Sequence, residues 1–197
     1  MRPKWLERWD GQLNKLIALI GNLLNIDRIE GERLPLHEEF YNFNELINEL
    51  VEELQRTTDD HKIIFNPEKE ITIFGERERV EQVFTNLISN AFKYSPPSEN
   101  ITVSTSVSDD RVSIAVRDKR LGILKENQEN ISERFYRVSG PENHTFPGLG
   151  LGLFISKEII KRQGGKIWVE SEVNKRSTFY FCLPVDHRTI LNNFTNA

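Results

Sequence analysis

The chain has 197 residues, of which 38% are hydrophobic and 28% are charged, a composition that suits one folded domain with an appendage. Its formal net charge of -4 gives no overall signal for binding to nucleic acid or to a membrane surface. No run of eighteen apolar residues is present and the start of the chain is unlike a signal peptide, so we expect a cytoplasmic protein without a transmembrane segment.

The N-terminal part, residues 4–29, has the pattern of one long helix. Its apolar residues recur every three or four positions, at Leu6, Trp9, Leu13, Leu16, Ile20 and Leu23. Because this narrow stripe is typical of a coiled coil or a four-helix bundle, the helix needs a partner. That partner can be a second copy of the chain, an upstream helix, or the chain's own globular part. We predict three segments: a helical segment 1–31, a folded domain 32–184 and a flexible tail 185–197.

Short strands and helices alternate after this segment. Leu34 to Phe40 has a strand pattern. Asn42 can cap the helix that follows, because Glu45 stands three residues later and completes the capping signal. Further strands are expected at 63–65, 71–74, 101–107, 111–116, 166–170 and 177–183. The last four of these strands are expected to form two hairpins.

A helix over residues 76–94 carries the first functional signal. Asn86, Asn90 and Lys93 follow the spacing of its apolar residues, but on the neighbouring face. Amide oxygens can ligate a hard cation such as Mg²⁺, and a lysine can meet a phosphate as a point charge. The row therefore suits a metal-bound polyphosphate. Taken alone, such a row is more often a helix face that is turned to water.

Residues 119–147 have no periodic pattern, and a connection of this length inside a folded domain is usually functional. It leads to three glycines on alternate positions, Gly148, Gly150 and Gly152, which open a helix that runs to Arg162. Backbone N–H groups and the positive end of the helix come together there, which favours phosphate binding. The alternative is a glycine-rich turn into a helix. The spacing fits neither a Walker loop nor a dinucleotide-binding fingerprint.

Asp118 ends a predicted strand, where its carboxylate could accept a hydrogen bond from the exocyclic amine of a purine. Alone it would be an ordinary turn aspartate. Four motifs, however, follow one another in the chain: Asn86-Leu-Ile-Ser-Asn-Ala-Phe-Lys-Tyr94, Asp118-Lys-Arg-Leu-Gly-Ile123, Glu133-Arg-Phe-Tyr-Arg137 and Gly148-Leu-Gly-Leu-Gly-Leu-Phe154. In this order they resemble the catalytic ATP-binding domain of bacterial sensor histidine kinases, which act in two-component signal transduction.

The resemblance covers residues 12–184, and Arg28-Ile-Glu-Gly31 is similar to the end of the second helix of the dimerisation hairpin of these kinases. It implies a two-layer α/β sandwich of the Bergerat type, in which three helices cover a mixed sheet, preceded by one long N-terminal helix. Residues 1–31 would be the second helix of a truncated hairpin, and would pair with a second copy of the chain or with a partner kinase. A response regulator would be served indirectly.

The resemblance also implies which residues handle the phosphates of ATP. Asn86 and Asn90 would hold Mg²⁺ and the phosphates, and Lys93 would neutralise phosphate charge. An acidic residue on the same helix, Glu81 or Glu78, would polarise the acceptor histidine. On the ATP side this set is chemically adequate, because phosphoryl transfer needs mostly positioning and charge neutralisation.

A second group of residues would recognise the base and close the site. Tyr94 would line the nucleotide pocket, Asp118 would bind the adenine amine, and Gly122 would let the backbone approach the base. Arg137 would reach a phosphate from the lid. The glycines at 148, 150 and 152 would bind phosphate through their backbone N–H groups.

Several features depart from the family pattern, and two of them bear directly on function. The acceptor histidine of the family lies in a His-Glu/Asp-x-x-Thr/Asn motif on the first hairpin helix. The histidines of this chain lie elsewhere, at His37, His61, His144 and His187, and we interpret all of them as surface residues. Arg120 stands where the family has a glycine beside the base, and it must swing out, stack on the base, or fill the pocket.

The sequence thus leaves two functions open. In the first, the chain is the catalytic domain of a truncated sensor histidine kinase, and it transfers the γ-phosphoryl group of ATP to a histidine that a missing segment or a partner supplies. In the second, it is a degenerate nucleotide-binding or interaction module without kinase activity. A serine kinase, chaperone or mismatch-repair relative of the same superfamily fits less well, because of the kinase-type lid and hairpin residues.

Calorimetry of ATP binding with and without Mg²⁺, on the unaltered chain and on Arg120→Gly, tests whether the predicted nucleotide site is intact. We expect magnesium-dependent binding by the unaltered chain, which would support an intact site. Binding by Arg120→Gly alone would favour the interaction module. Absence of binding in both proteins would contradict our placement of the pocket.

Overall fold

The computed structural model describes residues 37–108, 110–119, 122–138, 149–173 and 175–185. All of them belong to the unit Leu36–Ala197 of the chain. The helix expected at 4–29, the tail after 185, Arg120 and Gly148 lie outside the described residues. Within those residues, no helix is long and apolar enough to cross a bilayer.

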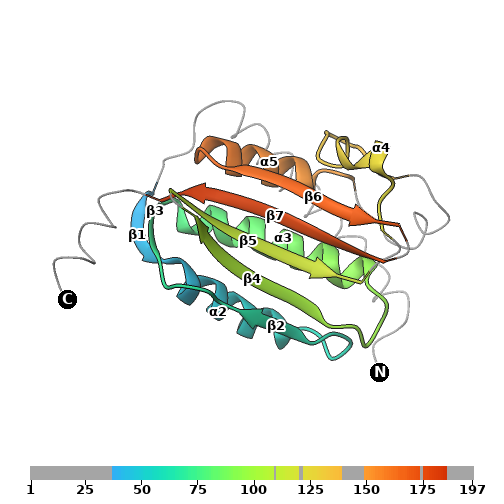
Figure 1. Ribbon diagram of the computed structural model, residues 1–197, viewed down its shortest axis with the longest axis horizontal. Coiled ribbons are helices and arrows are strands. Elements are labelled where there is room, and N and C mark those ends of the chain that lie inside the picture. The colour runs from blue at the N-terminus through green and yellow to red at the C-terminus, as the bar shows by residue number, and fades with distance from the viewer. Residues whose placement is uncertain (1–36, 109, 120–121, 139–148, 174, 186–197) are drawn as a thin grey trace, which may run out of the picture. The chain divides into compact units, whose positions relative to one another are not determined.

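A five-stranded sheet forms one layer of the domain, in the order β2-β4-β5-β7-β6 (Figure 1). The strands are β2 Ile63–Asn66, β4 Ile101–Ser108, β5 Arg111–Asp118, β6 Lys166–Glu172 and β7 Arg176–Pro184. β2 pairs with β4 in parallel and the other pairs are antiparallel, so the sheet is mixed. β1 Glu39–Asn42 and β3 Thr72–Gly75 form a separate antiparallel ribbon.

Three helices form the second layer: α2 Phe43–Gln55, α3 Arg77–Tyr94 and α5 Gly152–Arg162 (Figure 1). A short helix, α4 Lys125–Gln128, lies near β6. The expected two-layer α/β sandwich is therefore confirmed. The core lies between the layers. There the ring of Phe43 of α2 packs edge to face on the ring of Phe181 of β7, with 6.4 Å between the ring centroids. Burial of each such side chain stabilises the fold by about 1.5–3 kcal/mol.

Most of the expected elements are confirmed to within two residues. The helix expected at 76–94 is α3, and both expected hairpins form, as β4–β5 and β6–β7. Asn42 caps α2 as predicted: its Oδ1 accepts from the backbone N–H of Asn44 at 3.0 Å and of Glu45 at 3.2 Å. Cys182 of β7 is a free, buried cysteine.

Two expectations are wrong. The strand expected at 34–40 is shifted: His37 and Glu38 lie outside β1, which starts at Glu39 because its pairing with β3 runs from Glu39–Gly75 to Asn42–Thr72. His61 is not a surface residue. The chain folds back after α2 and buries His61. Its ring stacks on the ring of Phe92 of α3, with 5.6 Å between the ring centroids. Its Nδ1 lies 3.2 Å from the carbonyl oxygen of Glu99. His37 is exposed, as predicted.

Tyr41 of β1 is a buried polar group with an unusual environment. Only 8% of its surface is exposed, and among the described residues its hydroxyl has no hydrogen-bond partner. Burial raises the pKa of this phenol above its ordinary value of about 10. The folded state therefore binds the phenolic proton more tightly than the unfolded state does. The corresponding stability is complete below about pH 10 and is lost as the pH rises further.

We expect Tyr41→Phe to raise the free energy of unfolding at pH 8 by up to about 1 kcal/mol, because it removes a buried hydroxyl that lacks a partner. It should also reduce the loss of stability above pH 10. Urea unfolding at pH 8 and at pH 10.5 measures both effects. The control is Tyr180→Phe, which removes a hydroxyl that donates to Glu170 and should not stabilise the protein. A lower stability of Tyr41→Phe at pH 8 would contradict this account.

Candidate functional site

The last two turns of α3 carry the polar row that the sequence predicts. Asn86 and Asn90 are half-buried, and Lys93 is exposed. These three positions lie within about 60° of one another around the helix axis, so they share one face. Tyr94 is the last residue of the helix and is 36% exposed. The structure thus brings the predicted phosphate residues of α3 together beside an open surface.

The first turn of α5 lies directly against this row. A Cβ atom at Gly152 would overlap with Oδ1 of Asn86. One turn later, Ser156 accepts a hydrogen bond of 3.0 Å from Nδ2 of the same carboxamide. The predicted asparagine and the predicted phosphate-binding glycine are therefore neighbours in space, although 66 residues separate them in the sequence.

The loop before α5 is shaped by a second glycine. Gly150 has a φ of 69°, and a Cβ there would lie 2.5 Å from the carbonyl oxygen of Tyr136. Tyr136 is held in turn by its hydroxyl, which donates to Asn127 at 2.7 Å. The predicted lid segment that contains the half-buried Arg137 therefore packs against the glycine loop.

Asp118 stands at the end of β5, opposite Ser177 of β7, and is 2% exposed. A buried carboxylate at a strand end suits the recognition of a hydrogen-bond donor. After it the chain crosses the end of β6: Gly122 has a φ of 80°, and a Cβ there would overlap with the carbonyl oxygen of Glu172. The backbone N–H of Ile123 then donates to Ser171 at 2.8 Å. Gly122 is thus required by packing as well as by the predicted approach of a base.

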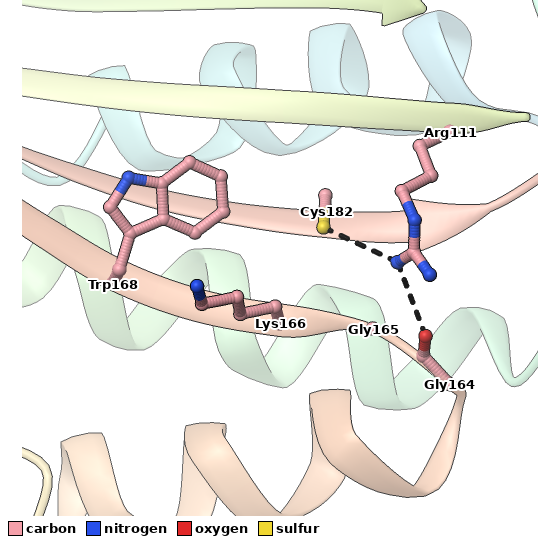
Figure 2. Close-up of a pocket in the computed structure, with 6 residues that line it drawn as sticks. All are labelled: Arg111, Gly164, Gly165, Lys166, Trp168 and Cys182. Carbon is pink, nitrogen blue, oxygen red and sulfur yellow. Dashed lines mark hydrogen bonds between the residues drawn. The ribbon is translucent and has the colours of Figure 1, made fainter. Parts of the chain in front are cut away.

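A hollow on the other face of the sheet contains none of these residues. It is lined by Arg111, Gly164, Gly165, Lys166, Trp168 and Cys182 (Figure 2). Alternation along β6 and β7 turns Trp168 and Cys182 away from the helices. Arg111 donates to the carbonyl oxygen of Gly164 at 3.3 Å and to Sγ of Cys182 at 3.6 Å. The predicted nucleotide residues are therefore not part of this hollow.

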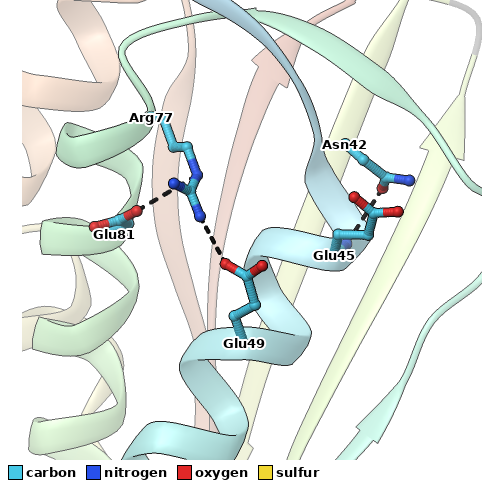
Figure 3. Close-up of polar contacts among 5 residues, drawn as sticks. All are labelled: Asn42, Glu45, Glu49, Arg77 and Glu81. Carbon is cyan, nitrogen blue, oxygen red and sulfur yellow. Dashed lines mark hydrogen bonds and ion pairs between the residues drawn. The ribbon is translucent and has the colours of Figure 1, made fainter.

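Glu81, the predicted catalytic carboxylate, contacts an arginine (Figure 3). The guanidinium of Arg77 forms two ion pairs: its Nε lies 3.6 Å from Oε1 of Glu81, and its Nη2 lies 2.6 Å from Oε2 of Glu49 on α2. It therefore links α2 to α3. Glu81 is also about 140° away from Asn86 around the helix. The structure does not bring Glu81 to the asparagine row, and its catalytic role stays a prediction. Glu78, the other candidate, is exposed in the first turn of α3.

The side chains present fit a metal-bound polyphosphate. Two carboxamide oxygens on one face can ligate Mg²⁺, and Lys93 adds a positive charge at the end of the same row. The start of α5 lies beside Asn86 and offers backbone N–H groups to a phosphate. Sequence reasoning missed Ser156, although a signal exists: it is a polar residue on the apolar face of α5, between Ile155 and Ile159.

Known proteins resemble the part of the chain that carries these residues. A family model described as Histidine kinase-, DNA gyrase B-, and HSP90-like ATPase matches residues 75–187, which include α3, Asp118 and α5. The sensor histidine kinase WalK of Bacillus subtilis (strain 168) is 30% identical over 186 residues. That match covers 92% of this chain and 30% of WalK, so the chain spans about a third of the length of this relative.

Solved structures of histidine kinases have a similar fold. The nucleotide-free catalytic domain of the histidine kinase ThkA matches with a TM-score of 0.67 and 27% identity, over 76% of this chain and 98% of that domain. Full-length ShkA in complex with AMPPNP matches with a TM-score of 0.80, over 92% of this chain and 38% of that chain. The identity to ShkA is 21%, so this likeness concerns the fold alone.

The ion pairs of Arg77 make the role of Glu81 testable. Glu81→Gln and Glu49→Gln each remove one carboxylate from the same partly exposed guanidinium. We expect both changes to lower the free energy of unfolding by less than about 1 kcal/mol, because these ion pairs are partly exposed. If Glu81 has the predicted catalytic role, Glu81→Gln alone also lowers phosphoryl transfer by about 10²–10⁴-fold. Urea unfolding and a transfer assay measure these effects, and equal transfer by the two variants would contradict the catalytic role.

Proposed function

The chain belongs to the histidine kinase-, DNA gyrase B- and HSP90-like ATPase family, and on this premise we propose that it transfers the γ-phosphoryl group of ATP to a histidine of another segment or molecule. The observation that carries the proposal is the contact between α3 and α5. It places the carboxamide of Asn86 against Gly152, at the start of a helix that can bind phosphate. In this proposal the chain is the kinase domain of a two-component signalling system.

On the phosphate side, Asn86 and Asn90 would hold Mg²⁺ through their carboxamide oxygens, and Lys93 would contact a phosphate oxygen. When bound, Mg²⁺ would neutralise part of the charge on the phosphates. The N–H groups around Gly150 and Gly152 would bind phosphate oxygens at the start of α5. Gly148 and Arg137 complete this set by resemblance to the family.

On the base side, the buried carboxylate of Asp118 would accept a hydrogen bond from the exocyclic amine of adenine. Gly122 packs closely on the backbone at the end of β6 and has no side chain. On the adenine side, the base would therefore meet main-chain atoms at this position. Tyr94 is partly exposed at the end of α3, where it would line the pocket. This arrangement favours a purine that carries an amine.

The transfer breaks the bond between the γ-phosphorus and the bridging oxygen of ADP, and forms a bond between that phosphorus and a histidine nitrogen. The His-Glu/Asp-x-x-Thr/Asn motif is absent from the 197 residues. Among the described histidines, His61 is buried and His37 precedes β1. The acceptor would therefore come from elsewhere, brought by pairing of the predicted N-terminal helix with a second copy or a partner kinase. A response regulator would then take the phosphoryl group.

The alternative is a nucleotide-binding or interaction module without kinase activity. Arg120 in the place of the family's glycine is the sequence feature that favours it. The two proposals differ in one outcome, which is the formation of phosphohistidine on an added acceptor.

The direct test supplies that acceptor. The purified chain is incubated with γ-labelled ATP, Mg²⁺ and a helical hairpin that carries a His-Glu-x-x-Thr motif, and alkali-stable, acid-labile label on the hairpin is measured. We expect labelling by the unaltered chain. Magnesium-dependent ATP binding without labelling would support the alternative.

In the same assay we expect Asn90→Ala to abolish labelling and to weaken the binding of ATP with Mg²⁺ by about 10- to 100-fold, because a ligand of a charged group is lost. Calorimetry gives the affinities. The matched control is Asn48→Ala, since Asn48 is exposed on α2 and bonds only to Glu52 among the described residues. Equal behaviour of the two variants would contradict the role of Asn90.

A further inference from the structure

Ser156 lies on α5 one turn beyond Gly152, and only 2% of its surface is exposed. Its neighbours on the buried face of the helix are the apolar side chains of Ile155, Ile159 and Ile160. A hydroxyl in that position is costly unless it is hydrogen-bonded. Its bond is to Asn86, whose Nδ2 donates to Ser156 Oγ over 3.0 Å. The serine therefore ties α5 to the polar row of α3.

The other end of the Asn86 carboxamide is enclosed by Gly152. The three atoms nearest to a Cβ at residue 152 are Oδ1, Cγ and Nδ2 of Asn86, with Oδ1 the closest. Gly122 and Gly150 have positive φ angles, but Gly152 does not. Backbone conformation therefore does not require a glycine at 152. A glycine is required at 152 because the carboxamide of Asn86 occupies the space that a side chain would take.

These two contacts favour one orientation of the amide. Nδ2 can only donate and Oδ1 can only accept, so the two ends of the carboxamide are not equivalent to a cation or a phosphate. A serine hydroxyl can donate as well as accept, so Ser156 alone would not choose between them. The first turn of α5 chooses between the two ends of the carboxamide, because its N–H groups and the positive end of the helix attract the oxygen rather than the NH₂ group. Oδ1 lies on that side.

We propose that Ser156 is a positioning residue, which holds the carboxamide of Asn86 in the orientation that the first turn of α5 favours, with its oxygen toward that turn, and that residue 152 is glycine because this carboxamide fills the place of a side chain. The inference deepens the proposed function and rests on it. An oxygen fixed in this way is ready to ligate Mg²⁺ beside the phosphates, without reorganisation when the nucleotide binds.

The first test compares the affinity for ATP with Mg²⁺ to the affinity in EDTA, and takes the ratio as the magnesium enhancement. We expect Ser156→Ala to reduce this enhancement about tenfold, as the loss of an outer-sphere partner does, while the affinity in EDTA stays the same. Ser156→Thr keeps the hydroxyl and should keep most of the enhancement. Gly152→Ala should lose the enhancement as Ser156→Ala does, because its methyl group displaces the carboxamide.

Thr105→Val is the control for loss of a buried hydroxyl away from the site. Thr105 is 5% exposed and bonds to Asn44. We expect it to lower stability without changing the magnesium enhancement. An unchanged enhancement in Ser156→Ala would overturn the proposal.

A second measurement needs neither nucleotide nor metal. In ¹⁵N-resolved NMR spectra of the free protein, we expect the side-chain NH₂ group of Asn86 to exchange slowly with solvent, and Ser156→Ala to abolish that protection. Equal exchange in both proteins would overturn the contact itself. If the protection is lost as expected but the unaltered chain does not bind ATP, the proposed function fails while the orientation of Asn86 stands.

Discussion

The packing of α3 on the sheet and beside α5 is the constraint on which the rest of the structure depends. One face of α3 is fully apolar and supplies Val80, Val83, Phe84, Leu87, Ile88 and Ala91 to the core. Because the helix cannot rotate without exposing that face, the positions of the residues on its other faces are fixed as well. The polar row of Asn86, Asn90 and Lys93 therefore has its direction set by hydrophobic burial rather than by its own contacts.

Two kinds of glycine occur among the predicted site residues. Gly122 and Gly150 adopt left-handed backbone conformations where loops pass close to other main-chain atoms. Gly152 is needed for a different reason, since it gives room to a polar side chain of α3. A pattern of glycines in a sequence thus does not by itself say which atoms are being approached. The structure separates backbone shape from side-chain accommodation.

Much of this arrangement could be predicted from the sequence because it depends on local periodicity. The bounds of α3, the cap at Asn42 and the two hairpins follow from patterns that extend over a few residues. The start of β1 and the burial of His61 could not be predicted, because each depends on a partner that is distant in the sequence: β3 for the strand, and Phe92 with Glu99 for the histidine. Local patterns carry no information about such partners.

The candidate site likewise has a part that could be predicted from the sequence and a part that could not. Its motif residues could be recognised in the sequence, whereas the ion pair of Arg77 with Glu81 and the bond of Asn86 to Ser156 are contacts between elements that only the fold brings together. Those contacts decide how a recognised residue can act. A carboxylate paired with a guanidinium and an amide held in one orientation can make fewer interactions than the same groups in water. Phosphoryl transfer is limited mainly by positioning and charge neutralisation. For this chain, the residues that hold the motif in place therefore determine its function as much as the motif does.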